Sequence, residues 1–250
     1  MLRTVAATRY VTPLREGGSL PALVEADDDG LYVVKLRGAG QGAKALVAEL
    51  VVGELGRALG LPVPELVRVE LDRHLPDAEP DPEIQELLAA SAGANVGLDF
   101  LPRALPYTPA TEGLAIEPWL AAAIVWLDAF SENVDRTPRN PNLLTWHGRL
   151  WLIDHGAALY KQHAGLDPAA AQGSFAAIRD HVLLPLAGSI EAADERLAPL
   201  VTPELLARLV AAVPPAWLGE VPAARYVEYL SARLAGRRAF VEEAERARRG

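Results

Sequence analysis

The stretch of sequence that decides the fold reads Phe130-Ser-Glu-Asn-Val-Asp135-Arg-Thr-Pro-Arg-Asn140-Pro-Asn-Leu-Leu-Thr-Trp-His-Gly-Arg-Leu-Trp-Leu-Ile-Asp154-His-Gly156. Asp135 is followed five positions later by Asn140. Two short apolar runs, 143–146 and 150–153, then predict a hairpin that ends at Asp154. Taken singly, these pieces are typical of a polar loop, a hairpin and the start of another loop. Their order along the chain is therefore what calls for an interpretation.

This order is that of an active site for phosphoryl transfer from ATP. In such sites one aspartate orients the attacking hydroxyl and accepts its proton, while an asparagine and a second aspartate hold Mg²⁺ against the phosphates. The pattern predicts Asp135 as the catalytic residue, and Asn140 and Asp154 as the metal ligands. Oxygen donors of this kind suit Mg²⁺ better than a transition metal, and the chain has no cysteine to supply a thiolate.

Composition narrows the class of protein. The chain has 250 residues, half of them hydrophobic, which is enough for one large domain or for two lobes that share a cleft. There is no run of eighteen apolar residues and no apolar signal core at the N-terminus, so we expect no membrane span and no secretion. The absence of cysteine fits a cytoplasmic location. A net charge of −9 argues against nucleic-acid binding by the surface as a whole.

Three short strands are predicted near the N-terminus, at 5–11, 20–26 and 31–36, and the third carries Lys35 near its end. A lysine on a half-exposed strand usually lays its stem over the sheet. Together with the downstream motif, however, Lys35 is the residue expected to hold the α- and β-phosphates.

A helix is predicted over 43–59, and it carries two acidic candidates for pairing with that lysine, Glu49 and Glu54. We favour Glu49, because it lies one turn before Gly53, where the helix can come close to the sheet. Glu54 is then expected to face solvent.

Two glycine-rich segments are candidates for the turn that covers the phosphates. Gly17-Gly18-Ser19 lies where such a turn is expected, although it does not match the full Gly-x-Gly-x-x-Gly pattern. The alternative, Gly38-Ala-Gly-Gln-Gly42, leads directly into the predicted helix, whose N-terminus would favour an anion. The sequence leaves both open.

Further strands are predicted at 64–71 and 95–101, and a short helix at 83–90; a proline-rich connector, 102–118, follows. Backbone groups of such a connector hold the adenine in kinases, so Leu98, Asp99 and Phe100 are candidate ATP contacts. Beyond residue 118 the pattern is helical, with segments at 120–130, 168–186, 189–197, 203–213 and 222–249. The predicted fold class is α+β: a two-lobed protein-kinase-like fold. Residues 1–101 would form a small nucleotide-binding lobe with an antiparallel sheet and one helix, and residues 119–250 a larger helical catalytic lobe.

The chain resembles the HipA-like kinases, a family that shares the protein-kinase-like fold with the phosphatidylinositol 3/4-kinases. The resemblance is carried by Tyr32-Val-Val-Lys35, Ala48-Glu49-Leu50, Asn133-Val-Asp135-Arg136 with Asn140-Pro-Asn142-Leu-Leu, and Leu152-Ile-Asp154-His-Gly156. In this family, as in the lipid kinases, an arginine follows the catalytic aspartate, as Arg136 does here. The resemblance implies that Asp135 is catalytic, that Asn140 and Asp154 bind Mg²⁺, and that Lys35 binds the phosphates of ATP.

Two positions depart from the family pattern: Thr137 stands where a histidine usually follows Asp-Arg, and His155 where a phenylalanine is common. No Ala-Pro-Glu segment or evident activation loop follows Gly156, and no DNA-binding element accompanies the motifs. The expected acceptor is a protein serine or threonine. The alternatives are a small molecule or lipid head group as acceptor, a nucleotide-binding pseudokinase, and a metal-dependent hydrolase built on Asp135, Asp154 and His155. The hydrolase would leave Lys35 and Glu49 without a role.

Overall fold

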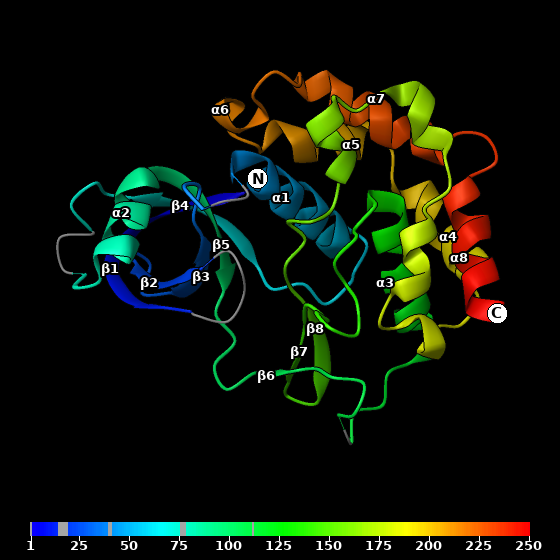
Figure 1. Ribbon diagram of the computed structural model, residues 1–250, viewed down its shortest axis with the longest axis horizontal. Helices are drawn as coiled ribbons and strands as arrows, with labels where there is room; N and C mark the ends of the chain where they lie inside the picture. Colours follow the sequence, from blue (N-terminus) through cyan, green and yellow to red (C-terminus); the bar gives the residue numbers. More distant parts are fainter. Residues whose placement is uncertain (1, 15–19, 40–41, 76–78, 112) are drawn as a thin grey trace.

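The computed structural model describes residues 2–14, 20–39, 42–75, 79–111 and 113–250. Its strands are β1 (Arg3–Pro13), β2 (Ala22–Ala26), β3 (Leu31–Lys35), β4 (Leu66–Leu71), β5 (Gly93–Asp99), β6 (Leu105–Pro106), β7 (Leu143–Trp146) and β8 (Arg149–Leu152). Its α-helices are α1 (Gly42–Ala58), α2 (Pro82–Ala90), α3 (Pro118–Ser131), α4 (Ile190–Leu197), α5 (Pro203–Ala211), α6 (Pro215–Leu218), α7 (Ala223–Leu234) and α8 (Ala239–Arg249). Figure 1 shows the first five strands on one side, most helices on the other, and α1 between them.

The strands β1 to β5 form a closed barrel in the order β1-β2-β3-β5-β4. Four of its strand pairs are antiparallel, but β1 and β4 run parallel, with Val5 opposite Val69. The expectation of an antiparallel sheet was therefore wrong at this pair. A parallel pair needs a long crossover between its strands, and the segment that contains α1 provides one. Closing the barrel also pairs the edges that an open sheet would leave exposed.

Alternating strand residues fill the barrel, as a period of two requires. Val24, Val34 and Val67 are fully buried there. Helix α2 covers this core with Ile84 and Leu88. Helix α2 confirms the short helix predicted at 83–90; with α1 it gives residues 1–101 two helices, where the predicted fold class named one.

Helix α1 belongs to a different hydrophobic core, which it shares with the helical part. Its buried residues Leu46, Leu50 and Leu55 lie in one cluster with α3 and the C-terminal helices, and it contacts both α5 and α6. Its other side meets β4 and β5. Gly60, in the left-handed conformation at φ +78°, follows the end of the helix. Helix α1 thus touches both halves of the molecule.

Helix α3 is the centre of the helical part. Every residue from Ala121 to Ser131 is buried, and the rings of Trp126 and Phe130 stack at 5.3 Å. Phe240 of α8 meets both rings. Because the C-terminus of α3 leads straight into the Asp135 loop, this core fixes where that loop starts. Across the described ranges, no helix combines the length and apolar character that crossing a membrane would require.

The segment after Gly156 differs from the predicted helix over 168–186. It is a series of short 3₁₀ turns: η2 (Tyr160–Ala164), η3 (Pro168–Gln172), η4 (Ala176–Asp180) and η5 (Leu184–Leu186), with η6 (Ala198–Leu200) following α4. Gly173 and Pro185 interrupt a continuous helix there. The predicted helix over 222–249 is likewise broken between α7 and α8, where Gly236 and Arg238 have positive φ. Within the connector, β6 pairs with β7.

Candidate functional site

Three charged residues from separate elements meet at one point. The ammonium of Lys35, at the end of β3, lies 2.6 Å from Oε2 of Glu49 in α1 and also donates to Oδ1 of Asp154, which follows β8. Glu49 is fully buried, whereas the side chain of Asp154 is 36 % exposed. The structure therefore brings together the predicted strand lysine, its preferred acidic partner and the aspartate after the hairpin. Glu54, the other candidate on α1, pairs instead with Arg57.

The charges in this cluster determine its protonation. Burial lowers the pKa of Lys35, but the negative charges of Glu49 and Asp154 outweigh burial and raise it above its ordinary value. Burial raises the pKa of Glu49, but the charge of Lys35 and the hydrogen bond from His155 bring the pKa down to about 2. Lys35 is therefore a cation and Glu49 an anion near neutral pH.

His155 lies beneath α1 rather than in the open part of the site. Its backbone N–H donates to Oε2 of Glu49 (2.7 Å), and its ring Nδ1 is 3.5 Å from Oε1 of the same carboxylate. The ring is fully buried. A Cβ on Gly53 would come within 3.0 Å of Leu66 in β4 and 3.6 Å of the His155 ring, so the glycine does allow close packing here. His155 is thus a support for Glu49, and a buried ring does not fit the catalytic part that a hydrolase would give it.

The loop around Asp135 is organised by its own asparagines. Asn140 donates through Nδ2 to Oδ2 of Asp135 (2.7 Å), and Asn142 donates to the same oxygen (3.2 Å). The N–H of Asp135 donates to Oδ1 of Asn133 (3.1 Å). Asp135 is partly exposed and Asn140 is exposed. The carboxylate is therefore held in a defined position while remaining open to a substrate.

Beneath this loop, Asp128 of α3 collects a set of buried donors. Its carboxylate accepts from Nδ2 of Asn133 (2.9 Å), Nε of Arg136 (2.5 Å) and Nε2 of His181 (2.9 Å). The N–H of Leu183 donates to Nδ1 of His181, so the ring proton lies on Nε2. Burial raises the pKa of Asp128, but the charge of Arg136 and the bond from His181 hold it well below its ordinary value. Burial lowers the pKa of His181, which keeps the imidazole neutral.

Arg136 ties the Asp135 loop to the hairpin that delivers Asp154. Its Nη1 donates to the carbonyls of Asn142 (2.5 Å) and Ile153 (3.1 Å), and the N–H of Ile153 donates to the Asn142 carbonyl (3.1 Å). Asp154 is the next residue, in the left-handed conformation at φ +56°. One continuous network therefore joins Asp135 to Asp154, and through Asp154 to Lys35.

The donor set of the two predicted metal ligands fits a hard divalent cation. Because Asn140 donates through Nδ2 to Asp135, its Oδ1 oxygen is the atom left for a cation. Asp154 supplies a partly exposed carboxylate. Oxygen ligands of this kind suit Mg²⁺ or Mn²⁺. Throughout the described part of the chain, no group of three or more histidines, cysteines, aspartates and glutamates has the arrangement of a metal site.

The geometry of a strand lysine, a helix glutamate and two aspartate loops can be compared with known proteins. The family model of the HipA-like kinases matches residues 8–234. The chain belongs to the HipA-like kinase family.

Solved structures of other kinases share this fold. The crystal structure of the Helicobacter pylori proinflammatory kinase CtkA is similar over 99 % of this chain and 98 % of that one, with a TM-score of 0.59 and 13 % identity. The Golgi casein kinase, solved with Mn/ADP bound, is similar over 97 % of this chain and 74 % of that one, with a TM-score of 0.54 and 13 % identity. At this identity the likeness concerns the fold, which is α+β and kinase-like. A comparison with curated proteins gave no match.

In this HipA-like kinase, two of the three residues predicted to contact adenine have backbone amides that already donate to other residues of the protein. Leu98 is buried. The N–H of Asp99 donates to the Glu65 carbonyl (2.8 Å) and that of Phe100 to the Leu31 carbonyl (2.9 Å). Neither amide is therefore left to donate to a nucleotide. The N–H of Leu101, which the sequence analysis did not select, has no acceptor among the described residues.

The two glycine-rich candidates are not distinguished. Gly17, Gly18 and Ser19 lie outside the described residues, as do Gly40 and Gln41 of the second candidate. The N–H of Gly38 donates to Oγ of Ser91 (3.0 Å), so this amide is engaged by the protein. The choice between the two segments stays open.

Sequence reasoning missed the buried support of the kinase site. Asp128 and His181 were not selected, and Arg136 was noted only for its place in the motif. A signal was present, because Asp128 is a lone charged residue within the apolar helix that precedes the loop. His181, 53 positions further on, gave no comparable signal.

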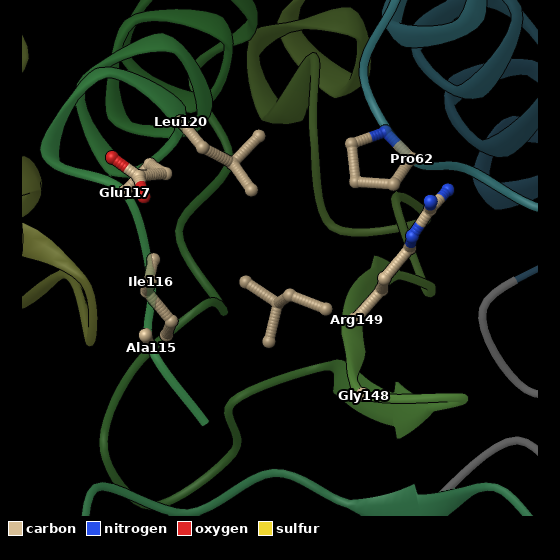
Figure 2. A pocket seen from close by; sticks show the side chains of 8 residues that line it. Pro62, Ala115, Ile116, Glu117, Leu120, Gly148 and Arg149 are labelled. Atoms are coloured by element: carbon tan, nitrogen blue, oxygen red, sulfur yellow. The ribbon is translucent and has the colours of Figure 1, made fainter. Parts of the chain in front are cut away.

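A separate cavity of about 210 Å³ lies between the end of the connector, the start of α3 and the β7–β8 turn. Figure 2 shows Glu117 and Arg149 on its opposite sides, with Ile116 and Leu120 on the Glu117 side. It shares no lining residue with the cluster around Lys35 and Asp135.

Proposed function

We propose that this HipA-like kinase transfers the γ-phosphate of ATP, with Mg²⁺, to a hydroxyl group, and that the acceptor is a protein serine or threonine. The observation that carries the proposal is the convergence of Lys35, Glu49 and Asp154, joined by hydrogen bonds to the loop that presents Asp135. An ion pair with a purely structural role would not require the nearby loop that presents the partly exposed carboxylate of Asp135. A phosphotransferase requires both the ion pair and this loop.

Lys35 is assigned to the α- and β-phosphates of ATP. Its ammonium is held by buried Glu49 and by partly exposed Asp154. Because its pKa is raised, the side chain carries its charge at neutral pH. When a nucleotide binds, the phosphates would become a further anionic partner of this ammonium while Glu49 keeps its direction fixed.

Asp135 is assigned to the acceptor hydroxyl. It would accept the proton as the hydroxyl oxygen forms a bond to the γ-phosphorus and the bond from that phosphorus to the β–γ bridging oxygen breaks, so that ADP leaves. Asn140 and Asn142 both donate to Oδ2 of Asp135, which orients the carboxylate. Positioning of this kind supplies most of the rate in phosphoryl transfer.

Asn140 and Asp154 are the residues that would hold the divalent cation. Mg²⁺, when bound there, supplies positive charge against the phosphate oxygens. The Golgi casein kinase, of similar fold, was solved with Mn/ADP bound. We place nucleotide binding in residues 1–101, the connector at 102–118 and the catalytic part at 119–250. The N–H of Leu101, just before the connector, is proposed as the donor to adenine, with Leu98, Asp99 and Phe100 beside it.

The proposal is tested by phosphate transfer from γ-³²P-labelled ATP with MgCl₂, first to the proteins of a cell lysate and then to a small-metabolite extract. Label on protein serine or threonine is expected. Asp135→Asn should remove transfer. Asp29→Asn should not, because Asp29 is exposed in the β2–β3 turn at φ +61°, a conformation that asparagine tolerates. Label only on metabolites would reassign the acceptor, and nucleotide binding without any transfer would support the pseudokinase alternative.

A further inference from the structure

The segment that follows Asp154 returns to α1 through Gln162, a residue that the proposed reaction does not use. Gln162 lies in η2 and is 1 % exposed. Its Nε2 donates to the carbonyl of Lys44 (3.0 Å), and Nζ of Lys44 donates to the carbonyl of Gln162 (3.0 Å). The hydroxyl of Tyr226, in α7, donates to Oε1 of Gln162 (3.0 Å). Both polar atoms of the side-chain amide therefore have partners.

Lys44 lies in the first turn of α1, the helix that carries Glu49. The same end of α1 also meets Gly156, whose Cβ position would lie 3.6 Å from Ala45. Further along the helix, Glu49 accepts from the N–H of His155. The chain from 154 to 162 thus runs along α1, and the reciprocal bonds between Lys44 and Gln162 hold the N-terminal end of this contact.

The segment that contains Gln162 is anchored to the helical part by a buried carboxylate. Its neighbour Lys161 forms an ion pair with the buried carboxylate of Glu132 (2.7 Å). The same carboxylate accepts from the Tyr229 hydroxyl (2.6 Å) and from Arg233 (3.2 Å), both in α7. A residue anchored in this way can fix the position of α1 relative to the helical part.

We propose that Gln162 is a positioning residue that sets the place of α1, and through Glu49 the direction in which Lys35 presents its ammonium to ATP. The inference rests on the proposed function for the role of Lys35. The side-chain amide of Gln162 bonds to the backbone carbonyl of Lys44, at the start of α1. The same helix carries Glu49, whose carboxylate lies 2.6 Å from the ammonium of Lys35. Loss of the side-chain amide leaves Glu49 and Lys35 intact but removes one of the two bonds between Gln162 and Lys44, and so loosens the end of the helix that aligns them.

The test compares Gln162→Met with Tyr226→Phe. Methionine keeps the length of the side chain and lacks both amide hydrogen-bonding groups. Phenylalanine removes one bond to the same amide and leaves the bonds to Lys44. We expect Gln162→Met to weaken Mg·ATP binding about tenfold, with a smaller change in kcat, and to speed backbone hydrogen exchange in the first turns of α1. Tyr226→Phe should alter neither by more than about twofold. Lys44→Met removes only the bond from the Lys44 ammonium, so it should give an intermediate loss of Mg·ATP affinity. It replaces Gln162→Met in the test if that variant does not fold.

A double-mutant cycle separates positioning from general stability. In a Glu49→Gln background, Gln162→Met should have little further effect on Mg·ATP affinity, because the link that it acts through is already cut. Additive losses, or equal losses in Gln162→Met and Tyr226→Phe, would overturn the inference. Unchanged exchange in α1 would also overturn it, and that readout needs no nucleotide. Failure of the wild-type protein to bind ATP would instead count against the proposed function.

Discussion

Replacement of Glu49 by glutamine removes one charge from the centre of the site without changing its shape. The amide can still accept from the N–H of His155, and Lys35 keeps its contact with Asp154. What is lost is the buried anion 2.6 Å from the ammonium, so Lys35 is free to follow Asp154.

The size of the effect follows from the electrostatics of the carboxylate. A pKa of about 2 instead of the ordinary 4.5 means that the folded protein favours the ionised form by about 3 kcal/mol. If about 2–3 kcal/mol of this serves to orient Lys35, kcat/KM for ATP should fall roughly 30- to 150-fold. Steady-state kinetics at saturating acceptor measure this, and Glu54→Gln is the matched control, because Glu54 lies on the same helix and is partly exposed. Equal losses in the two variants would refute the assignment of Glu49.

The same variant makes a prediction about pH. The pKa of Glu49 is lower in the folded than in the unfolded protein, so its contribution to stability is present above pH of about 4.5 and is lost as the pH falls toward about 2. Thermal unfolding should show a steeper fall in Tm over this range for the wild type than for Glu49→Gln. Parallel curves would show that the carboxylate is not stabilised by Lys35 in the folded state.

Three further substitutions test the frame of the site. Arg136→Met leaves the Asp128 carboxylate buried without its cation, so it should lower the free energy of unfolding by about 3–5 kcal/mol and the Tm by about 10 °C in thermal unfolding; an unchanged Tm would contradict the network. Burial holds the pKa of His181 below 6.5, so the free energy of unfolding of the wild type should decline as the pH drops below about 6.5, by up to about 1.4 kcal/mol per pH unit. His181→Gln should flatten that decline in denaturant titrations. Gly97→Ala would place a methyl group 2.6 Å from Val69 inside the barrel and should cost about 1–3 kcal/mol, measured by urea unfolding; a neutral result would mean that the barrel wall yields there.

The parts of the site that the sequence predicted are those set by local order along the chain. Asp135 and Asn140 are held in one loop by a side-chain hydrogen bond between them. Asp154 follows the predicted hairpin, although its second strand spans 149–152 and not 150–153. The preference for Glu49 over Glu54 was also correct in geometry, because Gly53 does let α1 approach β4. In each case the residues on which the prediction depended lie close together in the sequence, where their spacing can be read directly.

The parts that it did not predict depend on contacts between distant segments. The parallel pair of β1 and β4 joins strands about 60 residues apart, and nothing in either strand marks its partner. His181 meets Asp128 only because the turns after Gly156 fold back under the Asp135 loop. The engagement of the Asp99 and Phe100 amides was not foreseen for a related reason, since their acceptors, the carbonyls of Glu65 and Leu31, come from other segments.

Titration calorimetry of ATP binding, with and without Mg²⁺, in wild type, Asp154→Asn and Asp135→Asn separates the metal role of Asp154 from the acceptor role of Asp135. We expect wild type to bind ATP more tightly with Mg²⁺ than without it. Asp154→Asn should lose most of this gain, because it removes the partly exposed carboxylate assigned to the metal. Asp135→Asn should keep the gain while abolishing phosphate transfer. Equal Mg·ATP affinity in the two variants, or a wild-type affinity that does not depend on Mg²⁺, would contradict the account.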